Sequence, residues 1–262
     1  MSERYGIWPR PPWSGTGRVR SIASDNPDTP VLELNPKAWF RADQVVTDGE
    51  SVLSMTGLVG SEGDLTVGDG FANLGTSTAN NDTPYVSLEG FLTSTMPAAF
   101  WDFMMTGQWS LFAVYKVTDD AVNIASTDAD DWALYTDVAN EIMGIRVGDT
   151  AQYFDGVAGG TDYPTFLGDL VYFQGISTYP GLPIDSNLVF DCGPFPVGSP
   201  TVGNGGPYNI DLPLASVGTL RCGSNAGPIL SLAELIFFDR SVDADAEVTV
   251  ITGYLLNRYR AP

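Results

Sequence analysis

Apolar residues are most concentrated near the C-terminus, where two different patterns follow each other. Residues 230–238 form a nearly continuous apolar and aromatic run, broken only by polar Ser231 and Glu234, and this run has the length of a buried strand. After Asp239 and Arg240, apolar residues recur at spacings of 4, 3, 4 and 4, which predicts an amphipathic helix within residues 241–260. The apolar positions of this helix are Ala244, Val248, Ile251, Leu255 and Tyr259.

The ends of the predicted helix carry matching polar residues. Asp243 is the expected N-cap, and acidic residues follow it in the first turn. Arg258 and Arg260 lie at the other end, where positive charge complements the helix dipole. We therefore expect a buried strand, a sharp turn and a helix that packs on the protein's own sheet.

The rest of the chain from residue 35 alternates short apolar segments with turns rich in Gly, Pro, Asn and Asp. This pattern predicts about a dozen strands, an all-β sandwich and one terminal helix. The segment 194–213 is expected to be a long loop or an exposed excursion. The other predicted strands are 36–46, 52–59, 65–74, 85–92, 109–117, 132–136, 141–147, 151–155, 170–177, 187–191 and 219–222.

Residues 1–34 differ from the remainder, so we place a boundary between an extended basic arm (1–34) and a β domain (35–262). The prolines between Trp8 and Trp13 exclude a helix and favour an extended path. Either this arm packs along its own domain, or it docks on a neighbouring subunit. For docking, the expected contact residues are Trp8, Trp13, Arg18 and Arg20.

The formal net charge of −20 argues against two classes of partner. With 32 acidic and 12 basic residues, the surface repels nucleic acid and anionic lipid. Residues 1–20 contain no apolar signal-peptide segment, and no stretch reaches the ~20 apolar residues of a membrane span. We therefore expect a soluble protein made in the cytoplasm, or one exported by a route other than ordinary secretion.

The absence of histidine removes several kinds of chemistry. It excludes Ser-His-Asp and Cys-His catalysis and every imidazole metal site. The two cysteines, Cys192 and Cys222, are expected to be buried reduced thiols, with a disulfide between neighbouring strands as the alternative.

Acidic residues offer only weak candidates for a metal or catalytic site. The segment 128–131, Asp-Ala-Asp-Asp, is the densest calcium candidate but lacks the glycine and closing glutamate of an EF-hand loop. Glu62 and Asp64 form the nearest pair for glycoside hydrolysis, with no third alternating acid after them. We therefore predict that the protein is not an enzyme and has no metal or cofactor, and we leave a calcium site open.

Three loop aromatics, Trp132, Tyr163 and Tyr208, are candidates for stacking on sugar rings, with packing inside the domain as the alternative.

Both ends of the β domain resemble one family. Residues 38–43, Ala-Trp-Phe-Arg-Ala-Asp, resemble the opening of concanavalin A-like (laminin G-like) jelly-roll domains common in bacteriophage virion proteins. The Ala-Glu strand around Glu234, the Asp239-Arg240 turn and the helix ending in Tyr254-Leu-Leu-Asn-Arg-Tyr259 resemble the close of that domain. The likeness covers roughly residues 36–260 and departs from the family at Arg41 and at Glu247, which comes one position late.

The resemblance implies a two-sheet antiparallel jelly-roll sandwich with one C-terminal amphipathic helix. It also implies a non-enzymatic virion structural protein, either a minor tail or a surface decoration protein, made in the host cytoplasm. Such a protein binds other virion proteins through its arm, is oligomeric within the particle and displays a lectin-like domain to host-surface glycans. The alternatives are a free carbohydrate-binding lectin and a glucanase-type hydrolase.

Overall fold

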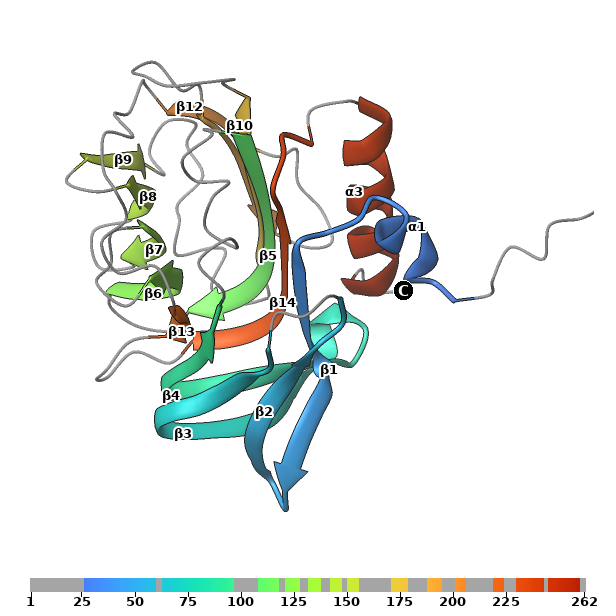
Figure 1. Cartoon of the computed structure of the whole chain (residues 1–262), viewed down its shortest axis with the longest axis vertical. Coiled ribbons are helices and arrows are strands. Elements are labelled where there is room, and N and C mark those ends of the chain that lie inside the picture. Colours follow the sequence, from blue (N-terminus) through green and yellow to red (C-terminus); the bar gives the residue numbers. More distant parts are fainter. Residues whose placement is uncertain are drawn as a thin grey trace, which may run out of the picture.

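The computed structural model describes most of the N-terminal half of the chain and the closing strand and helix, together with separate strands between them. The described residues are 26–59, 63–96, 108–117, 121–127, 132–137, 142–147, 150–155, 171–178, 188–194, 201–205, 219–223, 230–242 and 245–259. They are mostly β strand, and the chain closes with helix α3 (Asp245–Tyr259) (Figure 1). This confirms the prediction of a β-rich fold with one C-terminal helix.

The strands succeed one another along the chain with two short helical turns among them. The helical turns are α1 (Thr29–Leu32) and the 3-10 turn η1 (Thr78–Asn80). The strands are β1 (Ala38–Asp48), β2 (Ser51–Gly57), β3 (Leu65–Ser77), β4 (Thr83–Thr95), β5 (Gln108–Val117), β6 (Ala121–Thr127), β7 (Trp132–Asp137), β8 (Ile142–Val147), β9 (Thr150–Asp155), β10 (Val171–Thr178), β11 (Leu188–Pro194), β12 (Thr201–Gly205), β13 (Thr219–Gly223) and β14 (Leu230–Phe238).

Hydrogen bonds join all 14 described strands into one antiparallel network. The strand order is β12-β11-β10-β5-β14-β1-β2-β3-β4-β13-β6-β7-β8-β9, and β14 also pairs with β4. Strand β14 is the junction, because Glu234–Phe237 pair with β1 while Leu230–Leu232 pair with β4. Its other edge pairs with β5 along most of its length. The pairings therefore support an antiparallel β architecture but do not divide the strands into the two expected sheets.

Strand β14 is apolar at seven of its nine positions because both of its faces are covered. All nine of its residues are buried, as predicted for residues 230–238. Leu232, Leu235 and Phe237 belong to the main core cluster. Ala233, Ile236 and Phe238 belong to a second cluster that includes residues of α3. A strand buried on both faces needs apolar side chains at nearly every position, which explains the continuous apolar run.

Helix α3 packs on the sheet through the predicted stripe. Ile251, Leu255 and Tyr259 are buried, and Val248 is half-buried against the same cluster. Tyr254, which the stripe did not include, is also buried. Figure 1 shows α3 alongside β14, with α1 next to it. The remaining predicted helix residues, Asp243, Ala244 and Arg260, lie outside the described residues.

Two strands were not predicted from the sequence. β6 had no prediction at all, and β12 lies inside the segment 194–213 that we expected to be a loop. The β12 sequence Thr-Val-Gly-Asn-Gly has the composition of a turn, but pairing with β11 gives it a strand conformation. The prediction of a loop over the whole of 194–213 was therefore wrong at residues 201–205.

The end of the expected arm packs against the β domain. Residues 29–32 form α1, whose Val31 is fully buried in the cluster that contains α3. Asp28 forms an ion pair with Arg41 of β1. Residues 26–34 are therefore part of the packed structure and not of an extended segment. The earlier part of the arm lies outside the described residues.

Candidate functional site

A buried carboxylate lies where β1, β14 and α3 meet. Alternation along β1 places Trp39, Arg41 and Asp43 on one face of the strand. Arg41 lies directly opposite Glu234 of β14 in the antiparallel register. Because Trp39 belongs to the cluster that includes α3, this face of β1 and Glu234 are turned toward the helix.

Glu234 accepts three hydrogen bonds from neutral side chains. Trp39 Nε1 donates to Oε1 at 2.5 Å, and the Tyr254 hydroxyl donates to the same oxygen at 2.9 Å. The Tyr259 hydroxyl donates to Oε2 at 2.6 Å. Glu234 is fully buried. The strand carboxylate therefore joins the first strand to the last helix through protein donors.

Two arginines and two aspartates extend this arrangement toward the surface. Arg258 Nε lies 3.8 Å from Glu234 Oε2, and Arg258 Nη2 donates to Asp43 at 2.5 Å. Arg41 donates to Asp28 at 2.7 Å, to Asp43 at 2.6 Å and to the Tyr254 hydroxyl at 3.0 Å. We call the residues Trp39, Arg41, Asp43, Glu234, Tyr254, Arg258 and Tyr259 the Glu234 cluster.

The protonation preferences within the Glu234 cluster follow from burial and charge. Burial raises the pKa of Glu234, and the Tyr259 hydrogen bond and the charge of Arg258 offset part of that rise. Burial also acts to raise the pKa of Asp43, but the hydrogen bond from Arg41 and the charge of Arg258 outweigh it and lower that pKa. Burial and the charge of Glu234 raise the pKa of Tyr259, which therefore stays protonated as a donor.

A second set of contacts fixes the turn between β14 and α3. Arg240 donates two hydrogen bonds to the carboxylate of Glu247, at 2.8 and 2.9 Å, and one to the Leu34 carbonyl at 3.2 Å. The Ser110 hydroxyl accepts from the Val242 amide at 2.8 Å and donates to the Arg240 carbonyl at 3.1 Å. Glu247, the acid that comes one position later than in the resembled family, thus holds the helix to the turn that precedes it.

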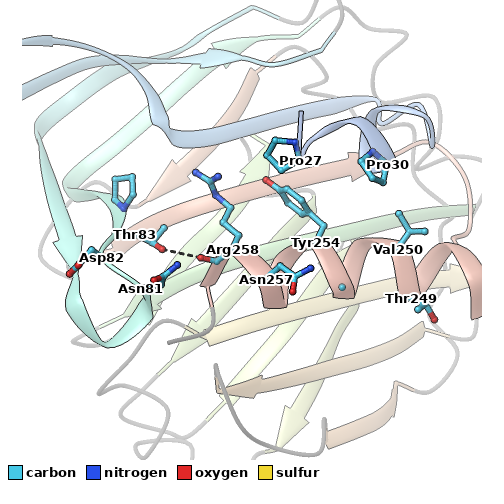
Figure 2. A pocket seen from close by; sticks show the side chains of 12 residues that line it. Pro27, Pro30, Asn81, Asp82, Thr83, Thr249, Val250, Tyr254, Asn257 and Arg258 are labelled. Carbon is cyan, nitrogen blue, oxygen red and sulfur yellow. Dashed lines mark hydrogen bonds between the residues drawn. The ribbon is translucent and has the colours of Figure 1, made fainter. Parts of the chain in front are cut away.

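An open groove lies along α3 beside Tyr254 and Arg258, two residues that also contact Glu234, and we call it the α3 groove. Its volume is about 790 Å³, within the ~300–1,000 Å³ range of small-molecule sites. Figure 2 shows Pro27 and Pro30 across the groove from α3, with Asn81, Asp82 and Thr83 at the end near Arg258. The lining residues are Pro27, Pro30, Asn81, Asp82, Thr83, Pro84, Thr249, Val250, Gly253, Tyr254, Asn257 and Arg258.

The turn between η1 and β4 is held at the C-terminus of α3. Asn80 Nδ2 donates to the Tyr259 carbonyl at 3.2 Å, and the Thr83 hydroxyl shares its proton between the Asn80 carbonyl and, at 3.4 Å, the Arg258 carbonyl. The Tyr259 and Arg258 carbonyls have no partner within the helix, so the turn completes the helix end. Asn81 and Asp82 lie between these contacts with left-handed backbone φ values of 57° and 52°. This geometry fixes both residues at the mouth of the α3 groove.

The predicted site residues lie outside the part of the chain whose side chains the structure describes. The arm residues Trp8, Trp13, Arg18 and Arg20 and the aromatic residues Tyr163 and Tyr208 lie outside the described residues. Trp132 begins β7, and its side chain is likewise outside the description. These residues remain predictions from the sequence.

The structure describes only some of the residues considered for hydrolysis, metal binding or thiol chemistry. Asp64 accepts a hydrogen bond from the Gly57 amide at 3.2 Å, while Glu62 and the calcium candidate 128–131 lie outside the described residues. Among the described residues there is no group of three or more His, Cys, Asp or Glu suited to a metal ion. Cys222 is a free buried thiol, and burial raises its pKa to about 12. None of the described helices has the length and apolar character that a membrane crossing requires.

Sequence reasoning missed both the Glu234 cluster and the α3 groove. One signal for the cluster was Glu234 within an apolar run, since a buried carboxylate needs donors. The alternation of Trp39, Arg41 and Asp43 was a second signal. For the groove, the signals were the Asn80-Asn81-Asp82 run, which favours left-handed backbone, and Gly253 inside the helix.

Comparison with known proteins gives only distant likenesses. No family model and no curated protein matches this chain. Among solved structures, it is similar to the binding domain of botulinum neurotoxin DC in complex with rat synaptotagmin II (TM-score 0.45, 8% identity, 79% of this chain and 52% of that chain). It is also similar to that domain in complex with SialylT (TM-score 0.46, 8% identity, 79% and 52%) and to the binding domain of serotype C1 (TM-score 0.46, 8% identity, 79% and 52%). The chain spans about half the length of these structures, and at these values the likeness carries no conclusion about the ligand or partners of this protein.

Proposed function

We propose that this chain is a non-enzymatic bacteriophage virion structural protein, a minor tail or surface decoration protein, whose β domain contacts host-surface glycans. One observation carries the proposal. The residues that resemble the opening and the close of concanavalin A-like virion domains meet in the Glu234 cluster. Trp39 of the first segment bonds to Glu234 of the last strand, and Tyr254 and Tyr259 of the last helix bond to the same carboxylate.

The two departures from the family pattern leave the closing arrangement intact. Arg41 supplies the charge that binds Asp28 and Asp43 and contacts Tyr254. Glu247 binds Arg240 through both carboxylate oxygens. Arg41 thus still joins the first strand to the closing helix through Tyr254, and Glu247 joins that helix to the turn before it.

The state of the buried carboxylate supports a non-enzymatic role. Glycoside hydrolysis needs two carboxyl groups that reach a substrate from opposite sides of the scissile bond. Glu234 instead accepts hydrogen bonds from Trp39, Tyr254 and Tyr259 and is fully buried. A carboxylate held in this way stabilises the fold and has no exposed face for a substrate.

The proposal assigns the arm to assembly, and purified particles test that assignment. The full-length chain and a variant with Trp8→Ala, Trp13→Ala, Arg18→Ala and Arg20→Ala are each expressed during infection, and particles are analysed by quantitative mass spectrometry. We expect the unmodified chain in particles and the variant in the soluble fraction with an unchanged melting temperature. Absence of the unmodified chain from particles overturns the virion role, and normal incorporation of the variant overturns the role of the arm.

A truncation provides a second test and should stop before the packed residues. Removal of residues 1–25 leaves Asp28 and Val31, which contact the β domain, in place. Removal of residues 1–34 also deletes α1, so loss of incorporation would then combine two causes. The first truncation is expected to keep the melting temperature and lose incorporation.

A further inference from the structure

We propose that the α3 groove is a binding site for a neutral saccharide. This inference rests on the proposed function, because it assigns a place on this chain to the glycan contact. It moves that contact away from the loop aromatics and onto the surface formed by α3, α1 and the turn at residues 81–84.

The first support is a glycine without a packing role. Gly253 lies in the middle of α3 and lines the groove. A Cβ atom built at this position would meet nothing within 4 Å, so no neighbouring element requires a glycine there. Glycine inside a helix costs roughly 0.5–1 kcal/mol relative to alanine. The glycine at this position weakens the helix, and its visible structural effect is to leave the wall of the groove bare.

The second support is a set of unoccupied polar side chains at the groove. No hydrogen bond or ion pair within the described part of the chain involves the side chains of Asn81, Asp82 or Asn257. Amide and carboxylate groups supply donors and acceptors in one plane, which suits the paired hydroxyls of a sugar ring. The anchored turn holds Asn81 and Asp82 in position before a ligand arrives.

The third support is the apolar surface beside these polar groups. Pro27, Pro30 and Pro84 line the groove together with Val250 and the ring of Tyr254. Tyr254 is held by its hydroxyl contacts to Glu234 and Arg41, so its ring has a fixed position. Rigid apolar faces next to a few directed polar groups are typical of small-molecule sites, and a sugar ring offers C–H faces and hydroxyls to match them.

The charge of the groove favours a neutral saccharide over an acidic one. Asp82 carries a carboxylate with no cation bound to it among the described residues. Arg258 also lines the groove, but its guanidinium binds Asp43 and faces Glu234. The positive charge of Arg258 is thus already compensated, while no described cation compensates the negative charge of Asp82. A carboxylated sugar would be repelled here.

The experiment compares saccharide binding by four full-length proteins. Lactose, maltose and cellobiose are the neutral probes, 3′-sialyllactose is the acidic probe, and binding is measured by saturation-transfer NMR and calorimetry. The proteins are the unmodified chain, Gly253→Gln, Asp82→Asn and the control Ala246→Gln. Ala246 is exposed on the same helix and does not line the groove, so its variant adds the same side chain elsewhere.

We expect at least one neutral probe to bind the unmodified chain and the Ala246→Gln control equally. Gly253→Gln should weaken that binding by about tenfold or more because its side chain fills the groove. Its melting temperature should not fall, since glutamine favours a helix more than glycine does. Asp82→Asn should weaken binding of the neutral probe and reduce the preference of the protein for that probe over 3′-sialyllactose.

Three outcomes overturn the inference. They are no binding of any neutral probe, full binding by Gly253→Gln, and tighter binding of 3′-sialyllactose than of the neutral probes by the unmodified chain. Incorporation into particles without saccharide binding would overturn this inference and leave the virion role intact. Binding at the groove by a chain that is absent from particles would overturn the virion role and support this inference.

Discussion

The Trp39 indole donates a hydrogen bond to the Glu234 carboxylate at 2.5 Å, although 195 positions separate the two residues in sequence. This contact connects the first strand of the β domain to the last. Tyr254 and Tyr259 bring the closing helix to the same carboxylate. Both ends of the β domain thus contact one buried acid, so we expect a small change at Glu234 to have a large effect on stability.

Removal of the Glu234 carboxylate should strongly destabilise the fold. Glu234→Ala leaves the buried donors of Trp39, Tyr254 and Tyr259 without their acceptor, and we expect a loss of about 3–5 kcal/mol in the free energy of unfolding. Glu234→Gln keeps one acceptor and should cost about 1–3 kcal/mol. Urea unfolding followed by tryptophan fluorescence measures both. The exposed control Glu89→Gln should stay within about 0.5 kcal/mol of the unmodified chain, and an equal loss in the control would contradict the prediction.

The stability effects of Glu234 and Asp43 should depend on pH with opposite signs. The pKa of Glu234 is raised above its ordinary 4.5, so its contribution is full below pH 4.5 and is lost as the pH rises through the folded-state pKa. The deficit of Glu234→Gln relative to the unmodified chain should therefore shrink as the pH rises above 4.5. The pKa of Asp43 is lowered from 3.8, so its contribution is present above pH 3.8 and is lost as the pH falls. The deficit of Asp43→Asn should shrink on acidification. Unfolding free energies at several pH values test this, and parallel pH profiles for the two variants would refute it.

Tyr254 should act together with Glu234. Tyr254→Phe removes the hydrogen bond to Glu234 and the one received from Arg41, and we expect a loss of about 1–3 kcal/mol. A double-mutant cycle with Glu234→Gln should give a coupling of about 0.5–3 kcal/mol because the two side chains share a hydrogen bond. Strict additivity of the two single losses would show that the shared bond contributes no stability.

Two glycines should respond to alanine in opposite directions. Gly253→Ala should stabilise the chain by about 0.5–1 kcal/mol, since the new methyl group meets no atom within 4 Å. Gly90→Ala should be strongly destabilising. At Gly90 the backbone φ is +132°, and a Cβ would lie 2.2 Å from the Asp69 carbonyl oxygen. Thermal unfolding of both variants tests these two predictions. Destabilisation by Gly253→Ala would contradict the finding that no atom lies near a Cβ at position 253.

Cys222 should be unreactive in the folded protein. Its buried thiol has a pKa raised to about 12, and only the thiolate reacts with alkylating reagents. In a Cys192→Ser variant, which isolates this thiol, iodoacetamide should label Cys222 at about pH 8 only after denaturation. Mass spectrometry gives the extent of labelling, and rapid labelling of the native protein would show that the site is open.

The elements that the sequence predicted well are those with two-sided or strictly periodic burial. Strand β14 is apolar on both faces, and α3 repeats its apolar residues with helical spacing, so both were predicted with nearly correct limits. The strand β12 was missed because its glycines and asparagine resemble a turn until β11 provides a pairing partner. Local composition cannot reveal a partner that is distant in sequence.

The candidate site was harder to predict for the same reason. In the sequence alone, Trp39 and Tyr254 are simply expected core aromatics, and Glu234 is a polar residue that interrupts an apolar run. They form one hydrogen-bonded cluster only because the β1–β14 register and the packing of α3 bring all three side chains together. Asn81 and Asp82 similarly belong to the α3 groove only because Asn80 and Thr83 bind the end of that helix.

The central claim is that α3 closes the fold through its contacts to Glu234 and also lines a groove that binds ligand. Chemical-shift mapping of the full-length chain, titrated with the neutral disaccharide that binds best, tests it most directly. We predict that the perturbed amides cluster at Asn81, Asp82, Gly253 and Asn257. A cluster of perturbed amides around Trp132, Tyr163 and Tyr208, with the α3 groove unchanged, would contradict the account.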